Sequence, residues 1–232
     1  MTDTLTPAAD FAARRRPAFP GETGDYAAAR QALLAAEIEL RRKMESVAEQ
    51  RRALPAGPVI EKDYRFLDAN GAELGLADLF GPHDTLVTFF WMYGPQRARP
   101  CPVCTNLVGA MNANAADVKQ NAALKILGRS PVSRQLAFGR ERGWAEIDFL
   151  QTVGDDYARD LGVLSPESGV LVVFRKDADG KVRLFWADEI SDEMADPGQD
   201  PRGAPELTTP LWHLLDLTPA GRAPDWYPKL KY

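Results

Sequence analysis

The chain has 232 residues, of which 45% are hydrophobic, and a formal net charge of −5. This length allows a substantial hydrophobic core and is compatible with one large domain or two small ones. The negative charge excludes a global basic field that would attract nucleic acid or an anionic membrane. We therefore expect no nucleic-acid partner, no membrane partner, and one main domain with a helical N-terminal extension.

The first segment, residues 1–22, is poor in core residues and contains the run Arg14-Arg15-Arg16. We expect a solvated, disordered tail, with docking to a partner as the less favoured interpretation. The segment lacks a basic stretch followed by an apolar one, and no apolar run approaches the roughly 20 residues that span a bilayer. These features predict a soluble cytoplasmic protein.

Residues 24–53 predict an amphipathic helix, because they contain no proline and no glycine after the first position. Thr23 is a suitable N-cap, and Pro55 ends the helix, so we assign the segment 23–54 to it. Its apolar residues follow one another at steps of seven, four and three and lie on one stripe: Leu33, Leu40, Met44 and Val47. The stripe either packs on the chain's own domain or forms the seam of a homodimer, although Glu37 interrupts the heptad.

The rest of the chain, residues 55–232, alternates short apolar segments with turns and helical patterns, and we expect it to form the main domain. The apolar run TLVTFFWMY at residues 85–93 is typical of a strand buried on both faces. Further strands are expected at 63–74, with a turn through Asn70-Gly71, at 124–128, at 147–153 and in a hairpin over 169–189 that turns at Asp179-Gly180. Helical segments are expected at 76–80, after the sequence CPVC, and at 132–144, 156–163 and 209–217, with a loop at 188–206. This alternation predicts an α/β fold with a mixed sheet covered on both faces and right-handed crossovers.

The sequence CPVC, residues 101–104, holds the only two cysteines of the chain. Cys101 follows a buried strand and precedes a helix, and α/β folds place their sites at this end of the sheet. The unpaired N–H groups of a helix start stabilise a thiolate and lower the thiol pKa, and Pro102 is harmless in the first helical turn. We therefore expect Cys101 to be the nucleophile, and Cys104, one turn into the helix, to resolve the mixed disulfide.

Four nearby side chains are candidates for a supporting role. Arg97 and Arg99 precede the motif and either add positive potential or are ordinary solvated loop arginines. Trp91 lies in the buried strand and is expected to belong to the core. Tyr93 fits either a redox site or a binding surface. These four residues therefore join the two cysteines and Pro102 in the set of candidate site residues.

Four stretches of the chain carry a resemblance to a known family: RRALP with EKDYRF soon after, LADLFG, FFWMYGP followed by CPVC, and DLTPAGR. In this order they resemble the bacterial thioredoxin-like family catalogued as domain of unknown function 899, over roughly residues 24–223. The resemblance implies a thioredoxin- or peroxiredoxin-like fold, a three-layer α/β/α sandwich around a central mixed sheet. It also implies dithiol chemistry, for which the family has no settled substrate.

Three positions depart from the better-known thioredoxin-like proteins. Nine residues, MYGPQRARP, separate Trp91 from Cys101, which is a longer loop than thioredoxins have. Ala98 stands where peroxiredoxins place a Thr or Ser, so the hydroxyl that would help to orient a peroxide is missing. Pro166 comes too early to match cleanly the cis-proline that precedes the strand facing the active site in thioredoxins.

The sequence offers little for a metal or a cofactor. A structural zinc ion needs four ligands, and the only histidines are His83 and His213. The strand after His83 places that residue roughly 20 Å from the cysteines, at about 3.3 Å per residue. The chain contains no GxGxxG and no phosphate loop, so we expect no nucleotide or flavin cofactor.

The sequence therefore predicts a thiol–disulfide oxidoreductase that acts on a protein or small-molecule thiol or disulfide. The alternative is a non-catalytic thioredoxin-like protein that binds a partner or senses redox state, with CPVC inert or only sensing. A Cys101–Cys104 disulfide that is inaccessible or does not form would favour the alternative.

Overall fold

The structure is a computed structural model, and the residues it describes are 5–14, 18–189, 194, 196, 210–223 and 225–232. The chain divides into two compact units, Met1–Pro55 and Ala56–Tyr232. Most of the loop expected at 188–206 lies outside the described residues, as do Arg15 and Arg16 of the basic run.

The first unit is built on the long helix α2 (Gly24–Arg52), which confirms the expected N-terminal helix. The Thr23 side chain caps it by accepting a hydrogen bond of 3.3 Å from the N–H of Tyr26. Every residue of α2 is described, and none is buried within this unit. Leu33, Leu40 and Met44 remain 53%, 62% and 62% exposed, whereas Val47 is half-buried, so most of the apolar stripe is exposed.

The stretch expected to be a disordered tail contains a short helix, α1 (Ala8–Ala12), which packs on α2. Ala8 and Ala12 are buried in this contact, because their small side chains let the two helices approach. Arg42 of α2 donates a hydrogen bond of 2.6 Å to the carbonyl of Thr6 and lies over the Phe11 ring. The position of α1 therefore depends on its packing on α2. Homodimer formation through α2 stays a prediction.

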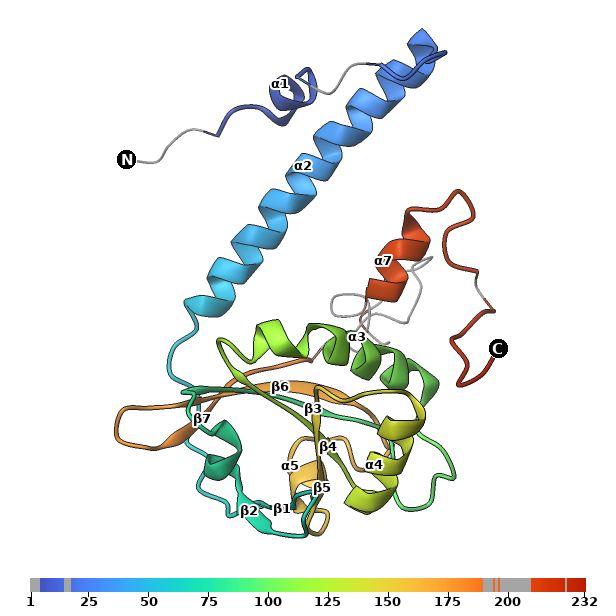
Figure 1. The fold of residues 1–232 in the computed structure, drawn as a ribbon. Helices are drawn as coiled ribbons and strands as arrows, with labels where there is room; N and C mark the ends of the chain where they lie inside the picture. Colours follow the sequence, from blue (N-terminus) through green and yellow to red (C-terminus); the bar gives the residue numbers. More distant parts are fainter. Residues whose placement is uncertain (1–4, 15–17, 190–193, 195, 197–209, 224) are drawn as a thin grey trace. The chain divides into compact units, whose positions relative to one another are not determined.

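The second unit contains one mixed sheet, in which the described residues form seven strands in the order β2-β1-β5-β4-β3-β6-β7 (Figure 1). The strands are β1 (Arg65–Leu67), β2 (Glu73–Gly75), β3 (Thr85–Phe90), β4 (Ala123–Gly128), β5 (Asp148–Thr152), β6 (Val170–Lys176) and β7 (Val182–Ala187). Strands β3, β4 and β5 pair in parallel, and the other pairs are antiparallel. The central strands are buried, as the apolar run at 85–93 predicts.

Helices cover both faces of this sheet. They are η1 (Leu76–Phe80), α3 (Pro102–Val118), α4 (Val132–Glu141) and α5 (Asp156–Asp160). A further helix, α7 (Pro210–Asp216), contacts α3. Along β4, Leu124 and Ile126 join the core under α3 and α4, whereas Ala123 and Leu127 join the core under η1 and α5. Alternate side chains of a strand point to opposite faces, so two separate cores result. This arrangement confirms the expected three-layer α/β/α sandwich around a central mixed sheet.

Two expected helices end earlier than their patterns predict, and a glycine follows each end. The helix expected at 132–144 ends at Glu141, shortly before Gly143, whose φ is 72°. The helix expected at 156–163 ends at Asp160, shortly before Gly162, whose φ is 69°. Glycine adopts this left-handed conformation readily and commonly ends helices in this way.

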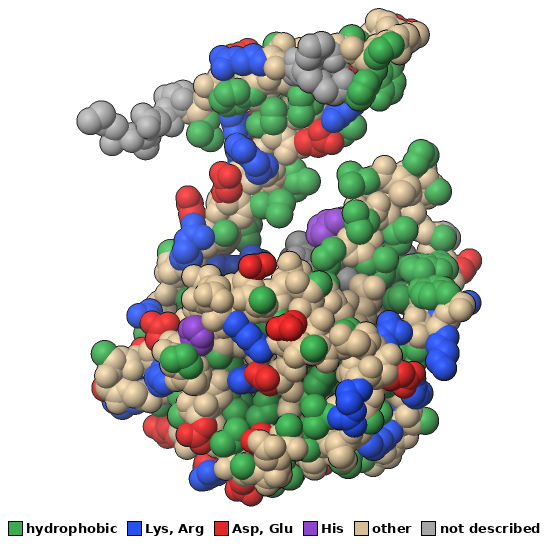
Figure 2. All heavy atoms as spheres, viewed as in Figure 1, with side chains coloured by type: hydrophobic (Ala, Val, Ile, Leu, Met, Phe, Trp, Pro, Cys, Tyr) green, Lys and Arg blue, Asp and Glu red, His purple; other side chains and the backbone are tan. Residues whose placement is uncertain are grey.

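The surface of the second unit carries charges of both signs. Figure 2 shows acidic and basic side chains interspersed over the visible face of this unit. Many of them form exposed ion pairs, such as Lys62 with Asp160 at 2.8 Å. Such pairs contribute little to stability, because water and salt screen them.

Candidate functional site

The CPVC segment begins at the carboxyl end of β3, where the chain turns into α3. Cys101 is the N-cap residue of α3, and Pro102 is its first helical residue. The N–H of Cys101 donates a hydrogen bond of 3.0 Å to the carbonyl of Met92, just after β3. Its carbonyl accepts a hydrogen bond of 2.8 Å from the Thr105 hydroxyl. Cys101 is thus anchored to the strand side and to the helix at once.

The two cysteines differ in exposure. Both are free thiols; Cys101 is partly exposed, whereas Cys104, one turn further along α3, is buried and only 6% exposed. A reagent in solvent therefore meets the sulfur of Cys101 first. Cys104 is left facing the protein interior, beside the sulfur that it would have to reach.

The environment of Cys101 favours its thiolate. A hydrogen bond from the Cys104 thiol, with further hydrogen bonds from the N–H groups of Cys104 and Val103, lowers the pKa of Cys101 from 9.0 to about 6. Partial burial opposes this change, and the positive charge of Arg97 adds to it. The N–H groups are those left unpaired at the start of α3, as expected for a cysteine at a helix N-terminus.

The pKa of Cys104 changes in the opposite direction. The hydrogen bond that it donates to Cys101, its burial and the nearby negative charge of Cys101 raise its pKa well above the ordinary value. Near neutral pH the pair therefore holds one thiolate, on the outer sulfur, and one thiol, on the inner sulfur.

The two candidate arginines point to different places. Arg97 forms an ion pair with Glu167, which lies before β6, and its charge reaches Cys101. Arg99 instead lies over the Phe138 ring, 4.9 Å from its centroid, and pairs with Glu141 at 2.5 Å. The structure therefore brings Arg97 to the cysteines, and it brings Arg99 to α4.

The candidate aromatic residues form the wall behind the motif. Trp91 is completely buried, and its indole N–H donates a hydrogen bond of 3.0 Å to the buried side chain of Gln135. Tyr93 is 4% exposed and packs edge-on against Trp91, with ring centroids 5.2 Å apart. Both rings belong to the core that also contains Cys104, so they support the site from inside and do not face solvent.

Two residues just before β6, Glu167 and Gly169, belong to the site, but no local sequence pattern marks them. A Cβ on Gly169 would lie 3.2 Å from the sulfur of Cys104, so only glycine fits there without displacement. A Cβ on Gly94 would lie 2.6 Å from Oε1 of Glu167, which shows how closely the two loops approach. The register of β6 with β3, which pairs Val170 with Phe90, brings this segment to the cysteines. The peptide bond Ser165–Pro166 in the same segment is cis.

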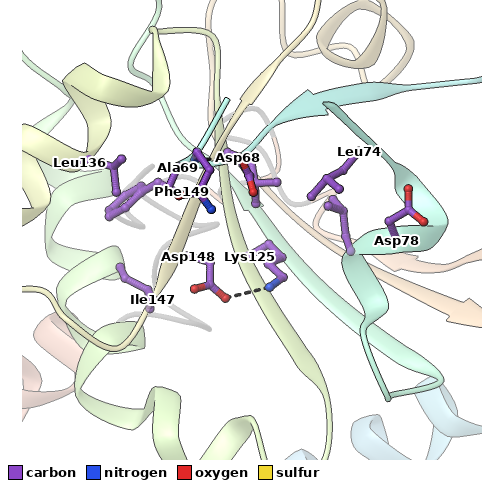
Figure 3. Close-up of a pocket in the computed structure, with 12 residues that line it drawn as sticks. Asp68, Ala69, Leu74, Asp78, Lys125, Leu136, Ile147, Asp148 and Phe149 are labelled. Atoms are coloured by element: carbon purple, nitrogen blue, oxygen red, sulfur yellow. Dashed lines mark hydrogen bonds and ion pairs between the residues drawn. The ribbon is translucent and has the colours of Figure 1, made fainter. Parts of the chain in front are cut away.

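A separate cavity of about 330 Å³ opens where β1 stops pairing with β5 (Figure 3). Its charged floor is the ion pair between Lys125 of β4 and Asp148 of β5, with N and O atoms 2.7 Å apart. The turn at Asp68, whose carboxylate accepts the N–H groups of Asn70 and Ala72, forms another wall. No residue of the CPVC segment lines this cavity, so it is distinct from the dithiol site.

The described part of the chain contains no group of three or more His, Cys, Asp and Glu side chains arranged to hold a metal ion. No described helix is both long enough and apolar enough to cross a membrane.

Several solved structures resemble the chain distantly. The exposed lipoprotein thioredoxin of Streptococcus pneumoniae is 13% identical, with a TM-score of 0.40, and the match covers 54% of this chain and 87% of that one. PrxQ of Xylella fastidiosa is 13% identical, with a TM-score of 0.41 and coverages of 58% and 84%. Peroxidoxin BcpB of Mycobacterium tuberculosis is 22% identical, with a TM-score of 0.37 and coverages of 56% and 82%. These values are too low to carry an argument about activity.

No curated protein matches the chain. A family model does match, over residues 18–232, and its description is "Bacterial protein of unknown function (DUF899)". Because the match spans nearly the whole chain and includes the CPVC motif, the chain belongs to this bacterial family, DUF899.

Proposed function

We propose that the chain is a cytoplasmic thiol–disulfide oxidoreductase whose reactive groups are Cys101 and Cys104. The observation that carries the proposal is the asymmetry of the two sulfurs. The outer sulfur is partly exposed with a pKa of about 6, and the inner sulfur is buried with a raised pKa. Disulfide exchange needs this division, because the attacking group must be an accessible thiolate and the resolving group must be held in reserve.

The reaction has two steps. The Cys101 thiolate attacks one sulfur of a substrate disulfide, which forms a mixed disulfide and releases the other half of the substrate as a thiolate. Cys104 then loses its proton and attacks the sulfur of Cys101, which forms the Cys101–Cys104 disulfide and releases the second half. The substrate gains two electrons and the protein loses two, so turnover needs a dithiol reductant to restore both thiols.

The loss of the Cys101 charge in the first step helps the second. The negative charge on Cys101 is one cause of the raised pKa of Cys104. Once Cys101 is in a mixed disulfide, that charge is gone, and the thiol of Cys104 no longer has a thiolate to which it donates a hydrogen bond. Its pKa therefore falls when its thiolate is needed.

We test this proposal by trapping. The Cys104→Ser variant keeps the attacking sulfur but cannot resolve, so it should accumulate mixed disulfides with its substrates in cells. The Cys101→Ser variant should trap almost nothing, because the remaining sulfur is buried. Both variants are purified after acid quenching and compared by non-reducing electrophoresis, and mass spectrometry of the adducts identifies the substrate class, protein or small molecule.

Two outcomes would count against the proposal. Equal trapping by the two variants would overturn the assigned roles of the sulfurs. Absence of adducts in both variants would favour the alternative, a non-catalytic thioredoxin-like protein that binds a partner or senses redox state. The double variant, in which both cysteines are replaced by serine, is the matched control for adducts that do not involve these sulfurs.

A further inference from the structure

The loop between β3 and α3, residues 94–100, is held by one side chain from α4. Nη2 of Arg134 donates a hydrogen bond of 2.6 Å to the carbonyl of Arg97 and one of 3.2 Å to the carbonyl of Ala98. Nη1 of the same side chain lies 3.4 Å from the carbonyl of Pro95. One guanidinium thus gathers three carbonyls of a loop that has no regular secondary structure of its own.

Arg134 also faces the base of the loop. Its guanidinium lies over the buried Tyr93 ring, 4.9 Å from the centroid, and Nη1 lies 3.4 Å from the hydroxyl of Ser130. That hydroxyl donates a hydrogen bond of 3.2 Å to the carbonyl of Gly94. The planar, forked geometry of arginine suits this combination of stacking and several acceptors, and a lysine ammonium does not reproduce it.

The other arginines near the site differ from Arg134 in their partners. Arg97 pairs with Glu167, Arg99 with Glu141, and Arg129 with Asp155. Among the described residues Arg134 has no carboxylate partner, and its hydrogen bonds go to loop carbonyls and one hydroxyl. Charge-assisted hydrogen bonds are about twice as strong as neutral ones, so this arginine supplies a strong constraint on the loop backbone.

The loop that Arg134 holds carries the charge that acts on the cysteines. Arg134 fixes the backbone of Arg97, and Glu167 fixes the guanidinium of Arg97. The loop then runs directly into Cys101, whose N–H is bonded to Met92. We propose that Arg134 is a positioning residue for the dithiol site, which holds the 94–100 loop so that Arg97 and Cys101 keep the geometry that the chemistry uses. This inference rests on the proposed function.

Loss of the constraint has a predictable direction. A loop freed from its three hydrogen bonds samples more conformations, because those bonds offset the conformational entropy lost when the loop backbone is fixed. Arg97 then spends less time near the sulfur, and the N-cap position of Cys101 is held less firmly. Both changes weaken the stabilisation of the thiolate, so the pKa of Cys101 should rise.

The experiment measures the pH dependence of Cys101 alkylation by iodoacetamide in the full, reduced chain, with mass spectrometry to assign the modified sulfur. Arg134→Met keeps much of the side-chain volume and should raise the midpoint by about 0.5–1 unit. Arg134→Lys keeps the charge but not the fork, so its midpoint should lie nearer to that of Arg134→Met than to that of the unchanged chain. Arg140→Met, an exposed arginine on the same helix, is the matched control and should leave the midpoint unchanged.

Hydrogen exchange of the peptide that covers residues 94–101 gives a second measurement. Exchange there should quicken in Arg134→Met and not in Arg140→Met. An Arg134→Met chain that unfolds cooperatively but keeps the midpoint of the unchanged chain would overturn the positioning role. If that variant fails to fold, Arg134→Lys decides by the same criterion. An unchanged chain that titrates as an ordinary thiol would instead overturn the proposed function, so the two failures are distinguishable.

Discussion

Two polar clusters lie in the same sheet, and they use their charges differently. In the cavity beside β5, the ammonium of Lys125 faces Asp148, and each charge serves mainly to balance the other. At the CPVC end, Arg97 pairs with Glu167, but its charge also acts on a sulfur that has its own lowered pKa. The comparison shows that charge alone does not distinguish a candidate site. A group that can react, and whose reactive form the charges favour, distinguishes it.

The clusters also differ in how tightly they are packed. At Gly169 a Cβ would meet the sulfur of Cys104 at 3.2 Å and the ring of Phe89 at 3.3 Å, so no free space remains. The cavity beside β5, by contrast, holds about 330 Å³ of free space. Dense packing around the resolving sulfur fixes its position, whereas side chains that line an open cavity are less constrained.

The largest effect should therefore come from filling the tight region. Gly169→Ala places a methyl group against the Cys104 sulfur, the Phe89 ring and the Phe90 carbonyl, and should lower the free energy of unfolding by about 1–3 kcal/mol. It should also slow closure of the Cys101–Cys104 disulfide, because the sulfur must shift. Urea unfolding of the reduced chain and the rate of intramolecular disulfide formation are the measurements.

Gly24→Ala is the matched control, since a Cβ there meets no atom within 4 Å and the backbone conformation is one that alanine adopts. A Gly169→Ala chain as stable as the unchanged one would contradict the claim that Cys104 is tightly packed at this position.

A smaller effect concerns how stability depends on pH, which should differ between the cysteine pair and the Lys125–Asp148 pair. The pKa of Cys101 is about 6 in the fold and 9.0 ordinarily, so the unfolded chain binds the extra proton between these values. The stability that the thiolate contributes is complete above pH 9 and is lost as the pH falls towards 6. As the pH rises from 6 to 9, the free energy of unfolding of the reduced chain should therefore increase relative to that of Cys101→Ser. The hydrogen bond to Cys101, together with burial, raises the pKa of Cys104, so the opposing contribution of that thiol begins only above pH 9.

The stability contributed by Asp148 in the cavity should depend on pH in a different, more acidic range. Burial alone would raise the pKa of Asp148, but the hydrogen bond and charge of Lys125, with Lys119, leave it below the ordinary value of 3.8. Stability from this carboxylate is lost only as the pH falls below about 3.8. Asp148→Asn should lower the free energy of unfolding by a constant amount above about pH 4 and should change its pH dependence only below that, in unfolding curves measured from pH 3 to 9. Cys101→Ser should instead remove the pH dependence between pH 6 and 9. A changed slope of stability against pH in Asp148→Asn between pH 6 and 9 would contradict this separation.

Much of the fold follows from local patterns in the sequence. The apolar run at 85–93, the proline-free stretch at 24–53 and the turn at Asp179-Gly180 each determine one element, and the structure has all three. The patterns place the ends of two helices beyond Glu141 and Asp160, where the structure ends them before Gly143 and Gly162. They also do not show that α1 packs on α2. Short elements depend on tertiary contacts, which a local pattern does not contain.

The candidate site was predictable only where its residues are contiguous. CPVC after a buried strand is a local signal, and it led to Cys101, Cys104 and Pro102. Glu167 and Gly169 lie just before β6, and Arg134 lies in α4, so only the sheet order and register bring them to the motif. No spacing in the sequence relates them to the cysteines, so they could not be selected without the three-dimensional structure.

The most direct test of the account is a redox titration of the full chain. The chain is equilibrated with mixtures of a reduced and an oxidised dithiol, quenched with acid, and the free thiols are alkylated and counted by mass spectrometry. We predict a single two-electron transition in which Cys101 and Cys104 disappear together and form one intramolecular disulfide. Thiols that persist under oxidising mixtures, or disulfides that form only between chains, would contradict the claim that the two sulfurs act as one redox pair.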